Sequence, residues 1–240
     1  DEWDNSEGGT FNVNKTTMVF SGATTLQGSE YSEFYNFTVD TDSAVMVVPS
    51  DSSSLTITGT ADFARANAVN TKTIYFYNAE SDTHYFTTTA NSAMSLSELY
   101  VAGNVEIYLN NDFTCANMYM NVPDSCSAYT QSSPFTAKIT TGDYTLTTTL
   151  EAHDYGTGTG KIEIDGTVDA QALVNLGGGT VLLIDSGSTV IAEDSIVSYA
   201  NESYSLVNNG SLDVAGSITG TPQITNTGTI ALTGGTSQFT

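Results

Sequence analysis

The stretch Leu206–Gly235 reads LVNNGSLDVAGSITGTPQITNTGTIALTGG and contains one seven-residue unit twice, at Gly210–Gly216 and at Gly228–Gly234. In each copy, two glycines enclose a short run in which apolar residues occupy alternate positions. Alternation with a period of two is typical of a β-strand that buries one face. The two copies begin 18 residues apart, and an Asn-containing turn precedes each. A strand that recurs at such spacing predicts a solenoid.

Related units occur earlier in the chain, and their spacing tests the repeat. The first apolar residues of the units are Leu55, Leu99, Ile162, Val181, Leu212 and Ile230. Most intervals between them approach one, two or three times a turn of about 18 to 22 residues. The interval of 31 residues from Val181 to Leu212 does not fit. We therefore expect an insertion or a short coil between Ala192 and Leu206.

These patterns predict an all-β fold, a single right-handed parallel β-helix with coils of about 20 residues. The composition agrees, because only 13% of the residues are charged and Thr, Ser, Asn and Gly fill the polar positions. Glycine and asparagine at the corners tolerate the left-handed backbone that sharp turns need. We place the β-helix at residues 11–240 and expect residues 1–10, DEWDNSEGGT, to form a flexible acidic arm.

The charge balance restricts the partners, since 27 acidic and five basic residues give a formal net charge of −22. Such a chain repels phosphate backbones, so we expect no nucleic-acid partner. No apolar run approaches the roughly 18 residues that a membrane span needs. A soluble surface that resists non-specific association is the favoured interpretation, and no cofactor is expected. Binding of Ca²⁺ is the alternative, and its candidate ligands are Asp40, Asp42, Asp165 and Asp169.

Three features favour an extracellular or cell-surface location. The chain begins at Asp1 without Met, which suggests a removed signal peptide or an engineered boundary. Cys115 and Cys126 are the only cysteines, and in an exported protein a disulfide closing the loop 115–126 is the default. Four sequons mark candidate glycosylation sites, at Asn14, Asn36, Asn201 and Asn209.

Several segments resemble known surface repeats. Val19–Gly28 (VFSGATTLQG), Glu33–Val39 (EFYNFTV) and Ser54–Gly59 (SLTITG) look like prokaryotic surface repeats of the type FSGTTTISG…FYNLTI…LTITG. Ile224–Gly234 (ITNTGTIALTG) is similar to coils of filamentous-haemagglutinin and autotransporter-passenger domains. The resemblance covers most of the chain in segments, and less clearly residues 60–95 and 110–150. It implies a right-handed parallel β-helix displayed on a cell surface, and it implies no specific ligand.

Carboxylates on the outer sheet are candidates for catalysis, because parallel β-helices include polysaccharide lyases and hydrolases. Glu163 and Asp165 lie at i and i+2 and therefore on one outward face. Alignment of the repeat units places Asp213 level with Glu163, and Asp169 lies nearby. Paired carboxylates serve glycosidases as acid and base. A lyase acting on acidic sugars would need Lys or Arg, which this chain largely lacks, so we expect a solvated acidic edge and no enzyme.

Histidines and tyrosines give two further candidates. His84 and His153 lie beside Asp residues, but the chain contains no G-x-S-x-G elbow that would accompany a serine nucleophile. The expected role of the tyrosines is cross-strand packing, and a sugar-binding aromatic strip is the alternative. Those in the middle third are Tyr75, Tyr77, Tyr85, Tyr100 and Tyr108.

The ends of a β-helix present open strand edges, which natural proteins usually cover. Residues 235–240 offer no amphipathic helix, no Pro and no charge, so we expect a nearly bare last coil. Either the natural chain continues, or another subunit covers that edge by a head-to-tail contact. The N-terminal arm or the strand Phe11–Val13 could complete the neighbour's sheet. The expected assembly edge comprises Trp3, Phe11, Val13, Ile230, Leu232 and Phe239.

The leading hypothesis is a structural cell-surface protein whose copies assemble head-to-tail into an extracellular filament, sheath or S-layer-like coat. The partners would be copies of the same chain. The runner-up is a monomeric adhesin or autotransporter-type passenger fragment that binds polysaccharide or a host ligand. A β-helix enzyme acting on polysaccharide is the third hypothesis.

Overall fold

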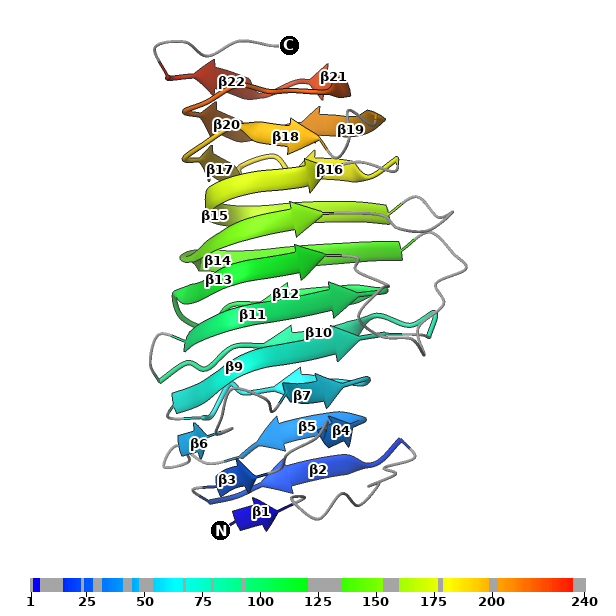
Figure 1. The fold of residues 1–240 in the computed structure, drawn as a ribbon, viewed down its shortest axis with the longest axis vertical. Helices are drawn as coiled ribbons and strands as arrows, with labels where there is room; N and C mark the ends of the chain where they lie inside the picture. The colour runs from blue at the N-terminus through cyan, green and yellow to red at the C-terminus, as the bar shows by residue number, and fades with distance from the viewer. Residues whose placement is uncertain are drawn as a thin grey trace.

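In a computed structural model the chain forms a parallel β-solenoid with roughly 22 residues per turn (Figure 1). All strand pairings among the described residues are parallel, and these residues include no helix, hence none long and apolar enough to cross a membrane. The parallel solenoid is confirmed, and its handedness stays a prediction. The structure describes residues 2–4, 15–22, 24–27, 32–40, 45–47, 54–66, 68–78, 80–91, 94–120, 135–152, 160–176, 179–198 and 203–234.

The strands stack on three faces, which we number 1 to 3. Face 1 consists of β2 (Thr17–Phe20), β5 (Asn36–Val39), β8 (Ala61–Asp62), β10 (His84–Thr87), β12 (Val105–Tyr108), the starts of β14 (Phe135–Ala152) and β15 (Gly160–Leu176), β16 (Val181–Ile184), β19 (Ser203–Asn208) and β21 (Thr221–Asn226).

Face 2 consists of β1 (Glu2–Asp4), β3 (Thr24–Gln27), β6 (Val45–Val47), the starts of β9 (Ala68–Tyr77), β11 (Met94–Ala102) and β13 (Phe113–Met120), the middle of β14 and β15, β17 (Thr189–Ala192), β20 (Ser211–Val214) and β22 (Thr229–Leu232). Face 3 consists of β4 (Ser32–Phe34), β7 (Ser54–Ile57), the ends of β9, β11, β13, β14 and β15, and β18 (Ile196–Ser198). Strands β1 and β22 lie at opposite ends of the stack (Figure 1).

The predicted insertion between Ala192 and Leu206 is wrong. The aligned repeat units lie on different faces, so the interval of 31 residues from Val181 to Leu212 runs from face 1 of one turn to face 2 of the next. Residues 192–206 include β18 and the start of β19, which pair with the turn before as their neighbours do. One strand pattern therefore serves all three faces, because each face presents the same inward and outward alternation.

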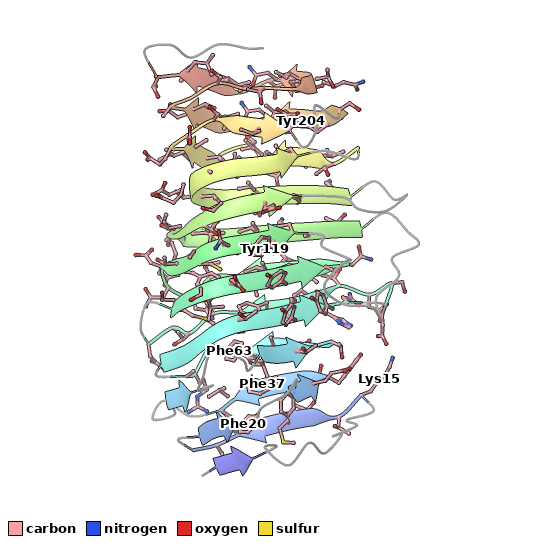
Figure 2. All side chains as sticks on the ribbon, in the orientation of Figure 1. Lys15, Phe20, Phe37, Phe63, Tyr119 and Tyr204 are labelled. Carbon is pink, nitrogen blue, oxygen red and sulfur yellow. The ribbon has the colours of Figure 1, made fainter. Side chains whose placement is uncertain are left out.

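The core is a set of columns in which each inward side chain packs on its counterpart one turn earlier. In the first half a run of ring contacts follows the axis from one column to the next, and it consists of Phe20, Phe37, Phe63, Phe86 and Phe113. The first three are labelled in Figure 2. These rings are not register partners, since Phe20 pairs with Val39 and Phe37 pairs with Met18. Successive ring centroids lie 4.8, 5.6, 5.5 and 6.5 Å apart. Aliphatic residues continue the core in the second half. Burial of these columns supplies the main driving force for stacking.

Buried hydroxyl groups fix the corners between faces. Thr141 is buried, and its Oγ1 accepts a 2.8 Å bond from the N–H of Thr167 in the next turn. Ser188 is also buried, and its Oγ accepts a 2.9 Å bond from the N–H of Gly166 in the preceding turn. Each bond satisfies a backbone donor that has left the strand ladder. The Ser- and Thr-rich composition thus follows from the number of corners as well as from the solvated faces.

Asn208 fixes the corner at the C-terminal end. Its side chain is fully buried, and its Nδ2 donates to Oδ1 of Asn226 at 2.8 Å and to the carbonyl of Thr229 at 2.9 Å. Its Oδ1 accepts a 3.3 Å bond from the N–H of Gly210. One side chain therefore ties two successive turns together.

The glycines of Leu206–Gly235 have a different role from the one predicted. Neither Gly210 nor Gly228 is among the glycines with positive φ. A Cβ at Gly228 would lie 2.0 Å from the carbonyl oxygen of Gly210, and a Cβ at Gly210 would lie 2.4 Å from that of Ser188. These positions need glycine because the backbones of successive turns approach closely, and not because the backbone is left-handed.

Part of the predicted N-terminal arm belongs to the solenoid. Glu2, Trp3 and Asp4 form β1 and pair with Thr25, Leu26 and Gln27 of β3. Residue 1 and residues 5–10 of the arm lie outside the described residues, so the arm stays a prediction for them. Residues 11–14, which were assigned to the β-helix, also lie outside the described residues.

We expect Asn208→Ala to lower the free energy of unfolding by about 2–3 kcal/mol, because it leaves buried backbone groups without partners. The neighbouring Asn209→Ala is the matched control, since Asn209 is only half-buried. It should cost less than about 1 kcal/mol. Urea unfolding followed by circular dichroism measures both values. Equal losses would contradict the role assigned to the Asn208 corner.

Candidate functional site

At the C-terminal edge of the solenoid, no strand among the described residues follows β21 and β22 over the core columns. Ile162, Leu182 and Leu206 succeed one another in a single column of face 1, and all three are fully buried. Ile224 is the next member, and it is 38% exposed. This inward position is therefore buried in the preceding turns and exposed to solvent in the last described turn.

The same change occurs on face 2 between β20 and β22. Leu212 and Val214 are fully buried, whereas Ile230 and Leu232, which pair with them, are only partly buried against the core. Ile230 and Leu232 were predicted at the assembly edge, and the structure places them at this rim. Ile224 was missed, although the alternation of apolar residues along β19 and β21 marks it. Of the other predicted edge residues, Trp3 lies in β1 at the opposite end, and Phe11, Val13 and Phe239 lie outside the described residues.

The backbone at this rim also offers groups that no described strand pairs with. The N–H of Thr229 bonds to Gly210, and a parallel strand directs its polar groups to its two sides alternately. Ile230 and Leu232 therefore direct theirs away from β20. Within the described part of the chain, no strand pairs with the outer edge of β21 or β22.

Pro222 gives partial protection to the rim on face 1. The N–H of Thr227 bonds to Asn208, so positions 222, 224 and 226 face the outer side of β21. Proline at position 222 has no N–H to offer there. Edge strands commonly carry proline for this reason. Pairing on β21 is thus restricted to its second half, whereas β22 has no such block.

Two of the carboxylates considered for catalysis, Glu163 and Asp165, are paired with lysines. Lys138 Nζ lies 2.9 Å from Asp165 Oδ2 and 3.3 Å from Glu163 Oε1, and Lys161 also bonds to Glu163. The hydrogen bond from Lys161 and the nearby Lys138 hold the pKa of Glu163 below its usual value. A general acid at neutral pH needs the opposite shift. The alignment of repeat units predicted that Asp213 is level with Glu163, and this is wrong. Asp213 lies on face 2, whereas Glu163 lies on face 1.

The candidate calcium ligands do not converge. Asp40 pairs with Arg65, Asp165 pairs with Lys138, and Asp169 lies on face 2. Asp42 lies outside the described residues. No group of three or more His, Cys, Asp or Glu residues among those described could hold a metal ion.

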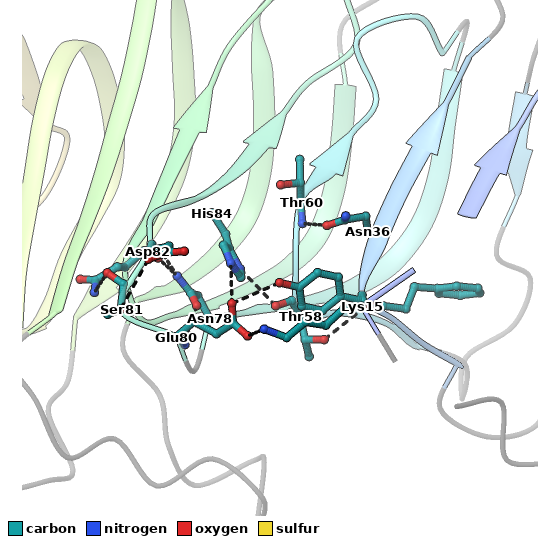
Figure 3. Close-up of polar contacts among 12 residues, drawn as sticks. Lys15, Asn36, Thr58, Thr60, Asn78, Glu80, Ser81, Asp82 and His84 are labelled. Carbon is teal, nitrogen blue, oxygen red and sulfur yellow. Dashed lines mark hydrogen bonds and ion pairs between the residues drawn. The ribbon is translucent and has the colours of Figure 1, made fainter. Parts of the chain in front are cut away.

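His84 belongs to a polar cluster that links successive turns at the entry to face 1 (Figure 3). Its Nδ1 lies 3.1 Å from the carbonyl of Thr58, and its Nε2 lies 3.7 Å from Glu80 Oε2. The hydroxyl of Tyr35 donates to the same oxygen at 3.2 Å, and Lys15 forms an ion pair with Glu80. The bond from Lys15 holds the pKa of Glu80 below its usual value. The cluster ties the first turns together. His153 lies outside the described residues.

Five tyrosines form two groups, and the buried Tyr77 packs beside the first of them against Tyr75. Tyr75, Tyr100 and Tyr119 stack along face 3 with centroid separations of 4.7 and 4.5 Å, which is the expected cross-strand packing. Burial raises the pKa of Tyr100. Because the rings in this stack cover one another, their faces offer little room to a sugar. Tyr85 and Tyr108 on face 1 are 42% and 36% exposed, with ring centroids 5.9 Å apart, and leave a free aromatic surface.

Cys115 lies in the core within β13. Its Sγ donates to the carbonyl of Asn117 at 3.0 Å, and burial raises the pKa of its thiol to about 12. It bonds to no cysteine within the described residues, and Cys126 lies outside them. The predicted disulfide therefore stays a prediction.

Two of the four sequon asparagines hold corners. Asn36 Nδ2 donates to Thr17 Oγ1 at 3.2 Å, and its Oδ1 accepts a 2.8 Å bond from the N–H of Thr60. Asn209 Oδ1 accepts a 2.7 Å bond from the hydroxyl of Thr227. Glycosylation stays a prediction for these two positions, and Asn14 and Asn201 lie outside the described residues.

Comparison with known proteins gives no relative for this chain: no family model, curated protein or solved structure matches it.

The lysine–carboxylate cluster on face 1 predicts a pH-dependent contribution to stability. The lowered pKa of Glu163 means that its contribution is present above the ordinary Glu pKa and is lost as the pH falls through the lowered value. Lys138→Met should therefore lower the Tm at pH 7 by about 2–4 °C, the change that about 1 kcal/mol produces in a chain of this size. At pH 3 the difference from the parent should shrink. Calorimetry at both pH values measures it, and an equal difference at both would contradict the cluster's role.

Proposed function

We propose that this protein is a structural subunit whose copies join end to end into an extracellular filament, sheath or S-layer-like coat. The observation that carries the proposal is the end of the core at β21 and β22, which no described strand covers. Ile224, Ile230 and Leu232 occupy inward positions yet remain exposed or partly buried, next to strand edges with unpaired backbone groups. Such an edge is a template for another strand.

The direction of the strands favours head-to-tail growth. Every pairing is parallel, so a second copy extends the faces only if its β2 end meets the β22 end of the first. A heterologous contact of this kind does not close on itself and produces an open filament. Each added turn lengthens the rod by about 4.8 Å.

The charge of the chain favours growth along the axis over lateral clumping. A net charge of −22 makes the flanks of neighbouring rods repel one another at low ionic strength. The rim, in contrast, consists of uncharged residues along β21 and β22. Flanks that repel one another and an uncharged end favour growth of a thin filament along its axis. The extracellular location rests on the sequons, on the composition and on the resemblance to surface repeats.

Substitution at the rim tests the proposal. Ile224→Glu should abolish end-to-end oligomers, because it places a charge where the next turn would bury an apolar side chain. Val197→Glu is the matched control, since Val197 is 37% exposed but lies on the flank in β18. It should assemble as the parent does. Light scattering across a concentration series and electron microscopy measure the outcome.

Two results would count against end-to-end assembly. One is a parent chain that remains monomeric at every concentration. The other is equal assembly of the Ile224→Glu and Val197→Glu variants, provided that circular dichroism shows both to be folded.

A second candidate function, binding of a polysaccharide as an adhesin, is favoured by the exposed pair Tyr85 and Tyr108. Two neighbouring rings on a flat sheet give apolar contact area, and Glu106 and Thr140 beside them are hydrogen-bonded to each other at 2.9 Å. Aromatic side chains with a few polar groups are typical of ligand sites.

The adhesin alternative predicts that Tyr85→Ala/Tyr108→Ala loses retention on immobilised neutral polysaccharides. Tyr144→Ala is the control, because Tyr144 is 38% exposed at a different place on the solenoid. Binding that survives the double substitution, or that Tyr144→Ala removes as well, would exclude this pair as the site.

A further inference from the structure

We infer that assembly pairs β22 of one copy with β3 of the next, and that β1 is a guard strand that β22 displaces. This inference rests on the proposed function and specifies its interface. It also assigns a role to β1, which the end-to-end proposal by itself leaves open.

The order in which the chain visits the faces gives the argument. At the C-terminal end the last described strands are β21 on face 1 and β22 on face 2. At the other end the order is β1 on face 2, β2 on face 1 and β3 on face 2. For both faces to continue from one copy into the next, β2 must follow β21, and β3 must follow β22. The place beside β3 that β22 then occupies is the place of β1.

The alternative joint leaves a gap. If β1 remained on β3 and itself stacked on β22, face 2 would continue through β1. Face 1 would then lack one strand between β21 and β2, which would lie about 10 Å apart instead of about 4.8 Å. The exposed Ile224 would remain uncovered on the side that faces this gap. Displacement of β1 is therefore the arrangement that covers the rim of both faces.

The register of the columns supports the exchange. Thr24 of β3 pairs with Met46, and Met46 pairs with Val69, which lies level with Met94. From Met94 the column continues to Ile230 through Phe113, Leu146, Val168, Val190 and Leu212. Two residues further along each strand, Leu26 and Leu232 occupy equivalent register positions on face 2. Because Trp3 pairs with Leu26, Leu232 of a neighbour would take the position of Trp3.

β1 has the features of a strand that protects an edge and can leave it. It has three residues, two of them acidic, whereas β22 has four and none of them charged. Short, charged edge strands are a common device against unwanted sheet extension. Among the described residues, β1 pairs with β3 and with no other strand. In the free chain β1 thus covers the edge of face 2 that the neighbour's β22 takes on assembly.

A disulfide lock tests the guard. Glu2 and Thr25 are register partners, so Glu2→Cys/Thr25→Cys should form an intramolecular disulfide that holds β1 on β3. We expect that the oxidised variant does not assemble and that addition of a reductant restores its assembly. The parent, which carries Cys115 and Cys126, and the single variant Glu2→Cys, given the same oxidation and reduction, are the controls. Light scattering and electron microscopy provide the readouts.

A second pair of cysteines tests the register between copies. Ala231→Cys/Thr25→Cys places the two cysteines in one column, one residue before Leu232 and Leu26. It should give a ladder of reducible oligomers on a denaturing gel. Ala231→Cys/Gln27→Cys moves one cysteine two residues along β3 and should give no ladder.

The outcomes separate the two proposals. Two results would overturn the displacement of β1 while leaving the proposal of end-to-end assembly intact. One is that the oxidised Glu2→Cys/Thr25→Cys variant assembles as the parent does. The other is that the two Ala231→Cys pairs, with Thr25→Cys and with Gln27→Cys, give equal ladders. A parent and a reduced lock variant that both remain monomeric would overturn the assembly proposal and this inference together. We expect the lock variant to lose assembly on oxidation and to regain it on reduction. We also expect a ladder from the Ala231→Cys/Thr25→Cys pair alone.

Discussion

The structure depends on the stacking of each turn on the turn before it. Backbone hydrogen bonds between parallel strands and the inward columns of side chains act at the same interfaces, so neither is complete without a neighbouring turn. A solenoid turn cannot bury its own apolar face alone. In the last described turn this neighbour is missing among the described residues, and Ile224 is exposed where its counterparts in the preceding turns are buried. The proposed function follows from this property of the architecture.

The corners explain the unusual composition. Where the chain turns from one face to the next, backbone donors and acceptors leave the strand ladders, and buried side chains such as Thr141, Ser188 and Asn208 bond to them. A turn of roughly 22 residues needs several such corners, so small polar residues occupy positions that helical proteins give to Leu and Ala. At Gly228, the close approach of the preceding turn leaves room for glycine alone.

The sequence was sufficient to predict the class of fold and part of the rim. Alternation at Gly228–Gly234 indicated a strand, and its recurrence indicated a solenoid, which placed Ile230 and Leu232 at the edge. It could not assign strands to faces, because one pattern of glycines and alternating apolar residues serves all three. For the same reason it predicted an insertion before Leu206 that the structure lacks. The cluster around His84 was also out of reach, since its members come from different turns, and only the register brings them together.

Hydrogen exchange at β22 tests the central claim, that the C-terminal rim of the solenoid accepts a second copy. In a dilute sample the N–H groups of Ile230 and Leu232 face no described strand and should exchange rapidly, whereas that of Ala231 faces β20 and should be protected. At concentrations where scattering shows oligomers, Ile230 and Leu232 should become protected to a similar degree. If oligomers form while these two amides exchange as fast as before, the copies join elsewhere and the account is contradicted.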